Sequence, residues 1–183
     1  YNIGEVIDNS EESDSQVYKK YKETIEEKNI PRLKGQDGMN IKISEDAKLE
    51  ILSPGENLEN KPKDTNADSI IAKLTYGENS FLLTGDLPDE KEQELIGKHA
   101  DLRADVLKVS HHGSKYATTL EFLEKVKPKD SVISVGKNNR YGHPAEETLD
   151  RLSSKEVRVL RTDELGDIEY FCKKESNCIL SKN

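Results

Sequence analysis

The chain is poor in aromatic residues: among its 183 residues it has no tryptophan, three phenylalanines and seven tyrosines. So few aromatic side chains argue against an extended groove that binds single-stranded nucleic acid by stacking many bases in succession. No apolar run approaches the roughly 18 residues of a membrane-spanning helix, and the N-terminus lacks a signal-peptide pattern. We therefore expect no transmembrane segment in this chain. Any such segment would have been removed or would lie outside it.

Cysteine is also scarce. The only two, Cys172 and Cys178, flank a polar segment near the C-terminus that is typical of a hairpin turn. A disulfide across this turn is possible, and two free thiols are equally possible. A five-residue spacing without a neighbouring histidine is a poor zinc signature. We therefore expect no metal at the cysteines.

Charged residues are abundant but unevenly distributed. The chain has a net charge of −8, yet residues 98–140 contain nine basic and five acidic side chains. A protein with an acidic overall field does not attract polyanions, whereas a locally positive zone around a site can hold a phosphate group. The alternative is that these lysines are ordinary solvated surface residues. The length and the 33% hydrophobic content are typical of one domain with a single core.

The apolar pattern predicts a mixed α/β chain that forms a single domain over residues 1–183. An amphipathic helix is predicted over 14–28, with Val17, Tyr21 and Ile25 on one face and Ser13 or Asp14 as N-cap. Further helices are predicted over 88–97, 118–127 and 144–154, and strands over 49–52, 69–76, 80–84, 105–110, 131–135, 157–161 and 167–171. Residues 53–68 are predicted to form a mobile polar loop.

Two of these strands end in groups that bind metals or transfer protons. The apolar run 81–83 leads into Thr84-Gly85-Asp86, and the run 106–109 leads into Ser110-His111-His112-Gly113-Ser114. Buried strands of α/β folds present functional groups at their carboxyl ends, so we expect a site there. His99, in a polar connection, is expected to be an ordinary surface residue.

Asp86 has two interpretations: it is a metal ligand, or it is the N-cap of the helix that starts near Pro88. Gly85 before it would let the backbone approach a bound ion closely. His111 and His112 should point to opposite sides if the backbone is extended, so only one would readily face a given metal. The other would contact substrate or pack as a structural histidine. Imidazole suits zinc, manganese or iron in a mixed nitrogen and oxygen site.

His143 lies immediately before the predicted helix 144–154. The positive N-terminus of that helix should depress the pKa of its imidazole and keep the ring neutral. A neutral imidazole can hydrogen-bond a phosphate or transfer a proton near neutral pH. The alternative is a turn histidine that helps to cap the helix.

These motifs carry a family resemblance. Thr84-Gly85-Asp86, Ser110-His111-His112-Gly113-Ser114 and Asn138-Asn139-Arg140-Tyr141-Gly142-His143-Pro144 follow one another within residues 69–171. That run resembles the C-terminal half of a metallo-β-lactamase-superfamily domain, and in particular of the ComEC-type competence (DNA-internalisation) proteins. The resemblance implies a four-layer αβ/βα sandwich, here mainly its C-terminal half, with a mixed β-sheet flanked by helices.

The resemblance also implies a site with two divalent metals, zinc or manganese, at an edge between the two sheets. Asp86 matches the metal-bridging aspartate of the family, and His111 or His112 matches its late histidine ligand. Such metals would lower the pKa of a bridging water and clamp the group under attack. We expect His143 and His111 to take part in catalysis. The expected substrate contacts are Ser114, Lys115, Asn138, Arg140 and Tyr141.

The sequence departs from the family at its start. No His-x-His-x-Asp-His motif occurs in these 183 residues, whose first histidine is His99. The opening at Tyr1 resembles the segment downstream of that motif, so we expect the motif to lie before residue 1. Asn66 stands roughly where other branches have a further histidine. Asp86 and one histidine are too few ligands for a zinc site.

Three hypotheses follow. The chain is part of a metal-dependent hydrolase that acts on phosphodiester bonds, with DNA as the leading substrate; or it pairs with another chain, which supplies the missing ligands. Otherwise it is a degenerate, metal-free binding module without catalysis, in which case no cofactor binds this chain. A homodimer would cover apolar strand faces that a half-domain leaves open. By analogy with competence proteins, we expect an extracytoplasmic location, either secreted or at the outer face of the bacterial cytoplasmic membrane.

Overall fold

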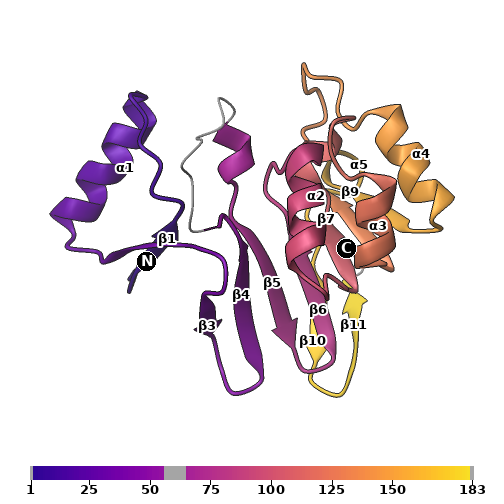
Figure 1. The fold of residues 1–183 in the computed structure, drawn as a ribbon, viewed down its shortest axis with the longest axis horizontal. Helices are drawn as coiled ribbons and strands as arrows, with labels where there is room; N and C mark the ends of the chain where they lie inside the picture. The colour runs from indigo at the N-terminus through magenta and orange to yellow at the C-terminus, as the bar shows by residue number, and fades with distance from the viewer. Residues whose placement is uncertain (1, 56–64, 182–183) are drawn as a thin grey trace.

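A seven-stranded mixed sheet forms the centre of the computed structural model, which describes residues 2–55 and 65–181 (Figure 1). The strands lie across the sheet in chain order: β3 (Asn40–Lys42), β4 (Ala47–Ser53), β5 (Ile71–Tyr76), β6 (Asn79–Leu83), β7 (Val106–Lys108), β8 (Asp130–Ile133) and β9 (Arg158–Arg161). Strands β3 to β6 pair antiparallel, and β6 to β9 pair parallel. The predicted hairpin followed by β-α-β units is therefore confirmed.

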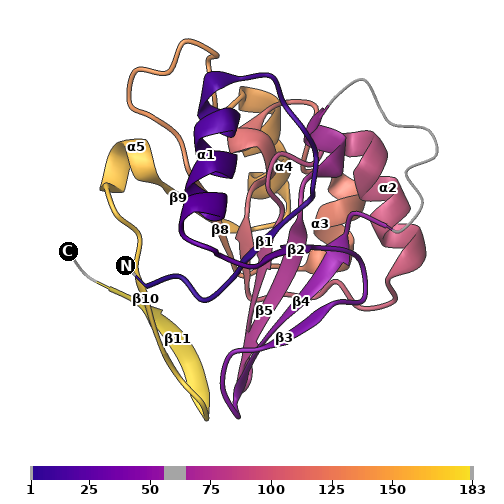
Figure 2. The same cartoon turned by 90° about the vertical axis from the view of Figure 1, so that its left-hand side faces the viewer.

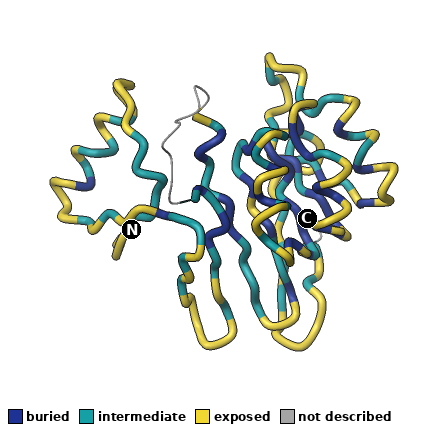
Figure 3. Tube along the Cα trace, in the orientation of Figure 1, coloured by how far each residue is buried: buried dark blue, intermediate teal, exposed yellow. Residues whose placement is uncertain are grey.

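The helices α2 (Asp89–Lys98), α3 (Leu120–Val126) and α4 (Glu146–Ser154) each connect two parallel strands and group around them (Figure 1). They bury one face of the sheet, and the most buried part of the chain lies between them and the strands (Figure 3). This core joins strand residues to helix residues, among them Leu82, Leu107, Ile133, Leu95, Phe122 and Leu152. The predicted fold class, a mixed α/β chain whose sheet is flanked by helices, is confirmed.

The N-terminal residues form a small unit beside the antiparallel strands (Figure 2). Strands β1 (Val6–Asp8) and β2 (Arg32–Lys34) pair in parallel and are connected by helix α1 (Gln16–Glu27). Neither strand was predicted, because three residues are too few to show an alternating pattern. No helix among the described residues is both long enough and apolar enough to cross a membrane.

Helix α1 was predicted over nearly the observed range, but two details of that prediction are wrong. Its N-cap is Ser15, whose Oγ accepts the backbone N–H of Tyr18 at 3.2 Å, and not Ser13 or Asp14. Ile25 is buried as expected, whereas Val17 is 81% exposed. The helix therefore buries only the C-terminal part of its apolar stripe.

Residues 56–64, which are most of the predicted loop 53–68, lie outside the described residues. The last four residues of the loop form the 3-10 turn η1 (Thr65–Asp68). After β9 the chain forms the short helix α5 (Thr162–Leu165) and then the antiparallel hairpin of β10 (Tyr170–Lys173) and β11 (Ser176–Leu180). The predicted strand 167–171 is thus shifted toward the C-terminus, and β11 was not predicted.

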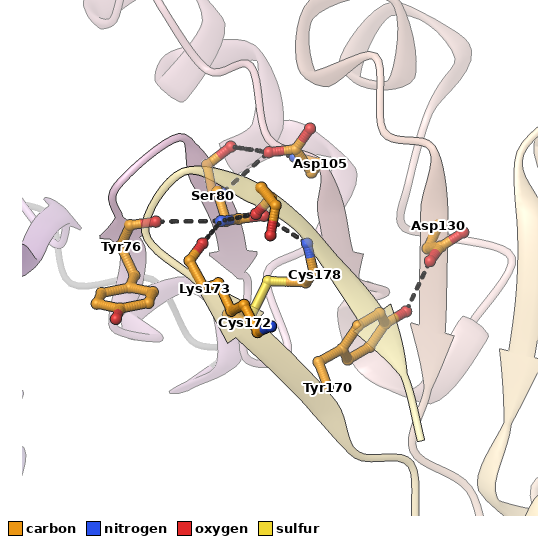
Figure 4. Close-up of a disulfide and its surroundings, with 10 residues drawn as sticks. Tyr76, Ser80, Asp105, Asp130, Tyr170, Cys172, Lys173 and Cys178 are labelled. Carbon is orange, nitrogen blue, oxygen red and sulfur yellow. Dashed lines mark hydrogen bonds between the residues drawn. A yellow bond between two sulfur atoms is a disulfide. The ribbon is translucent and has the colours of Figure 1, made fainter. Parts of the chain in front are cut away.

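A disulfide joins Cys172 to Cys178 across this hairpin, and no cysteine is free (Figure 4). Asn79, which is 2% exposed, docks the hairpin onto the start of β6. Its Nδ2 donates to the carbonyls of Lys173 and Ser176, and its Oδ1 accepts the N–H of Cys178. The hydroxyl of Tyr170 donates to Asp130 at 2.9 Å and holds the other end of the hairpin (Figure 4).

Candidate metal and phosphate site

The carboxyl ends of three neighbouring parallel strands bring the predicted site residues to one edge of the sheet. Asp86 follows β6, the turn η2 (Ser110–Gly113) follows β7, and the loop 134–143 follows β8. Gly85 has a φ of +53°, and its carbonyl accepts the N–H of His111 at 3.1 Å. This bond ties the first two of these segments together.

The backbone at the two histidines is not extended, so the premise of the prediction that their side chains point to opposite sides is wrong. His111 and His112 have φ values of +46° and +55°, in the left-handed region that residues other than glycine rarely occupy. The Ser110 hydroxyl donates to the Leu87 carbonyl at 2.6 Å and anchors the start of this turn. The Ala145 N–H donates to the Gly113 carbonyl at 2.8 Å and anchors its end.

His112 faces Asp86 through its Nε2 atom. Its Nδ1 lies 2.6 Å from the carbonyl oxygen of Ser134, and because a carbonyl only accepts, Nδ1 carries the proton. Nε2 then lies 3.6 Å from Oδ1 of Asp86. In a neutral ring, Nε2 offers a lone pair, so two acceptors face each other unless a proton or a cation lies between them. A second interaction that fixes the tautomer is typical of histidines that bind metals.

Asp86 does not cap helix α2. The N-cap position is Pro88, and no side chain makes a capping hydrogen bond there. The backbone N–H of Asp86 donates to the Ser69 hydroxyl at 3.2 Å, which fixes the residue, and its side chain is 38% exposed. The capping interpretation is therefore wrong, and the carboxylate stays available to a ligand.

His143 completes a cluster of three imidazoles. Its ring centroid lies 5.9 Å from that of His111, and the His111 and His112 centroids are 6.5 Å apart. Burial lowers the pKa of His143, the neighbouring His111 and His112 lower it further, and the charge of Asp86 opposes this shift. The predicted direction of the shift agrees, but the predicted cause does not. Helix α4 starts only at Glu146.

His143 does not cap that helix, because its N-cap is Ala145 and no side chain bonds there. The backbone of His143 is instead held by one side chain: Asn139 Oδ1 accepts its N–H at 2.9 Å, and Asn139 Nδ2 donates to its carbonyl at 2.7 Å. Asn139 therefore shapes the loop that presents His143. Sequence reasoning had placed it only in a shared loop.

The predicted substrate contacts fall into two groups. Lys115, Asn138, Arg140 and Tyr141 are exposed, and the Tyr141 ring stacks on that of His143. Ser114 is only 4% exposed, and its Oγ accepts the N–H of Tyr116 at 3.3 Å. A ligand would have to displace this contact to reach the Ser114 hydroxyl. All five assignments stay predictions.

His99 and Asn66 lie outside the histidine cluster, and His99 differs from its predicted role. His99 is not an ordinary surface residue: its side chain is 18% exposed, and Nε2 lies 3.0 Å from the Leu52 carbonyl and 3.4 Å from Asp37 Oδ1. Asn66 lies in η1, and its carbonyl accepts the N–H of Ser69. The hydroxyl of Ser69 in turn accepts the backbone N–H of Asp86.

Lys108 is a further candidate that sequence reasoning missed. It is half-buried near the end of β7, and its Nζ donates to the carbonyl of Val109 at 2.9 Å. Burial lowers its pKa, and the charge of Asp86 opposes that shift. The signal in the sequence is a lysine inside an otherwise apolar strand, where a charge must find a partner.

The donor set fits a divalent cation in part. A carboxylate oxygen and an imidazole nitrogen that face each other are suitable ligands for zinc or manganese. Within residues 2–55 and 65–181, however, no three His, Cys, Asp or Glu side chains are grouped so that they could hold a metal ion. Asp86 and His112 would therefore supply only two ligands, and a metal site needs more.

Comparison with curated proteins places the chain among competence proteins. It is 43% identical to ComE operon protein 3 of Bacillus subtilis (strain 168) over 141 residues, which are 77% of this chain and 17% of that protein. It is 35% identical to competence protein ComA of Neisseria gonorrhoeae over 123 residues, 67% of this chain and 17% of ComA. It is also 35% identical to recombination protein 2 of Haemophilus influenzae over 106 residues, 56% of this chain and 13% of that protein.

The chain thus spans only 13–17% of the length of these relatives. No protein-family model matches it. Among solved structures, a protein of Parabacteroides distasonis that is described as a metal-dependent hydrolase is similar in fold. The alignment covers 87% of this chain and 64% of that protein, with a TM-score of 0.48 and 13% sequence identity.

Proposed function

We propose that this chain, which belongs to the family of ComEC-like competence proteins, forms part of a metal-dependent phosphodiesterase site that acts on DNA during competence. One observation carries the proposal: Nε2 of His112 and Oδ1 of Asp86 face each other at 3.6 Å, while Nδ1 of His112 is committed to the Ser134 carbonyl. A cation between these two atoms would make the pair complementary.

Asp86 and His112 would hold the metal, with His111 as the next available donor. When bound, a divalent ion supplies a Lewis acid that polarises a phosphoryl group and lowers the pKa of a bound water. Two metals, zinc or manganese, are proposed for the complete site. The remaining ligands would come from a second copy of this chain in a homodimer, so that the chain and the metal alone would form the site.

His143 would act as the proton-transfer group of the site. Its lowered pKa favours the neutral ring near pH 7, and a neutral imidazole both donates and accepts a hydrogen bond. Because Asn139 fixes the backbone on both sides of His143, the ring is held in place without using its own nitrogens. It therefore stays free to contact a phosphoryl oxygen or a leaving group.

The charge around the site favours a phosphorylated substrate. Residues 98–140 contain nine basic and five acidic side chains although the whole chain is acidic, and the exposed Arg140 lies over Tyr141, whose ring stacks on His143. Such a local field attracts phosphate groups. The disulfide between Cys172 and Cys178 supports a location outside the cytoplasm, where disulfides persist.

Cleavage of a labelled oligonucleotide tests the function. The chain is incubated with a 5′-labelled DNA strand and manganese or zinc, and the products are separated by size. We expect metal-dependent cleavage that Asp86→Asn abolishes. Asp150→Asn, which changes an exposed carboxylate on α4, is the matched control and should cleave like the wild type.

An alternative function is a metal-free binding module of the same fold. Wild-type chain that binds the oligonucleotide but leaves it intact at every metal concentration would support this alternative and contradict the phosphodiesterase.

A further inference from the structure

A pocket of about 450 Å³ opens directly beside the histidine cluster. This volume is within the range of small-ligand sites. It is lined by His112 of the turn η2, by Thr162 at the start of α5, and by residues of the loop between β8 and α4, namely Ser134, Val135, Gly136, Asn139, Tyr141 and His143. We call it the Tyr141 pocket. Because His112 and His143 belong to both the pocket and the candidate site, a ligand of nucleotide size could occupy the two together.

The polar groups of the pocket wall are largely used within the protein. Thr162 Oγ1 accepts the N–H of Val135 at 2.8 Å and lies 2.9 Å from the Val135 carbonyl. The side chain of Asn139 bonds the backbone of His143 through both of its polar ends. What the wall offers to a ligand is therefore mainly ring and aliphatic surface. Such a wall suits a flat, weakly polar group better than a phosphate.

Tyr141 is a strongly exposed part of this wall, with 69% of its surface accessible. Its ring lies 6.0 Å from the His143 ring at an interplanar angle of 20°, so the two rings are nearly parallel. The guanidinium of Arg140 lies 5.4 Å from the Tyr141 ring centroid. An exposed aromatic ring beside a cation is the pair of groups that binds a base and its phosphate in single-stranded nucleic acid.

We propose that the Tyr141 pocket binds one unpaired nucleobase, which stacks on the ring of Tyr141 while its phosphate lies beside the guanidinium of Arg140. The inference rests on the proposed function, since it names the form of nucleic acid that the same site accepts. A base in a duplex is stacked on both faces and cannot enter the pocket, so the site selects single strands or frayed ends. One stacking position also agrees with the scarcity of aromatic residues in the chain.

Fluorescence anisotropy without metal tests the inference separately from catalysis. The ligands are a labelled oligothymidylate and an abasic oligonucleotide of the same length and charge. The variants are Tyr141→Ala, Tyr141→Phe and the control Phe171→Ala, which removes an exposed ring (60% accessible) from the β10–β11 hairpin. Because Tyr141 and Phe171 are both exposed, all variants should fold, and circular dichroism checks this.

We expect wild type to prefer the oligothymidylate over the abasic strand. Tyr141→Ala should weaken oligothymidylate binding at least about fivefold, the lower bound for one lost base–aromatic stack, and should leave abasic binding unchanged. Tyr141→Phe and Phe171→Ala should bind like wild type. The inference is overturned if wild type binds both ligands equally or binds neither, or if Tyr141→Ala binds oligothymidylate like Phe171→Ala.

The two proposals fail in different ways. If the chain binds the base-bearing strand through the Tyr141 ring but never cleaves DNA with metal, the inference stands and the proposed phosphodiesterase activity is contradicted. If the chain cleaves DNA with metal but binds the abasic and base-bearing strands equally, the proposed phosphodiesterase activity stands and the inference is contradicted.

Discussion

At the scale of single residues, the geometry of the candidate site depends on which atom of a side chain already makes a hydrogen bond within the protein. His112 commits Nδ1 to a backbone carbonyl and so turns Nε2 toward Asp86. Residue type and position after a buried strand were enough to predict Asp86 and the histidine pair. Which nitrogen faces the carboxylate could not be predicted, because it depends on a carbonyl of Ser134, 22 residues away in the sequence.

Asn79 provides a prediction at this scale. Its buried side chain makes hydrogen bonds to both strands of the disulfide hairpin, so Asn79→Ala leaves several backbone groups without partners. We expect the free energy of unfolding in urea to fall by at least about 2 kcal/mol. Asn177→Ala, at an exposed position of the same hairpin, should change it by less than about 0.5 kcal/mol. Equal effects of the two substitutions would contradict the role of Asn79.

At the scale of elements, the turn η2 decides where both histidines point. Sequence reasoning assumed an extended strand as far as Ser110, but β7 ends at Lys108 and left-handed residues follow. No local pattern predicts this, because positive φ is uncommon even for histidine, although histidine adopts it more often than most residues other than glycine. The turn is stabilised by contacts with distant segments, namely the carbonyls of Gly85 and Leu87 and the N–H of Ala145.

Two glycines, one in η2 and one in the loop 134–143, allow the cost of a steric clash to be measured separately from the cost of backbone strain. Gly113 and Gly142 have φ values of +84° and +70°, but a Cβ on Gly113 would lie 2.6 Å from Pro144 Cβ, whereas a Cβ on Gly142 would meet nothing within 4 Å. Gly142→Ala should cost about 1–2 kcal/mol of stability from backbone strain alone. Gly113→Ala should cost clearly more in the same urea experiment. Similar losses would show that contact with Pro144 does not matter.

The unit formed by β1, α1 and β2 should be sensitive to acid. Burial raises the pKa of the Asp8 carboxyl, but hydrogen bonds from Arg32, from Tyr21 and from the N–H of Ser10 outweigh it, so the net pKa is lowered. Burial and the bond to Asp8 also raise the pKa of Tyr21 to about 12. The Arg32 Nε lies 2.8 Å from Asp8 Oδ2.

Because the folded pKa of Asp8 lies below the unfolded one, its contribution to stability is complete above the ordinary value of about 3.9 and is lost as the pH falls through the lowered folded value. Asp8→Asn should therefore be less stable than wild type at pH 6, with a difference that shrinks below about pH 3.9. Amide exchange in residues 16–27 measures this. Asp14→Asn, at an exposed position, is the control. A difference that grows toward low pH would contradict the assignment.

At the scale of the whole molecule, the parallel half of the fold was predictable and the N-terminal part was not. Helices α2 and α3 carry acidic residues in their first turns, and α4 is preceded by Pro144, so their starts could be predicted closely. Strands β1, β2 and β3 have three residues each, too few for a periodic signal. The stacking of Tyr141 on His143 depends on a loop shaped by Asn139, and no sequence pattern revealed it.

The central claim is that Asp86 and His112 bind a divalent metal, and isothermal titration of the chain with zinc or manganese tests it most directly. We expect the metal to bind to wild type and to Asp150→Asn, and to be lost in Asp86→Asn and in His112→Ala. Binding that is the same in all four proteins, or absent from the wild type, would contradict the account.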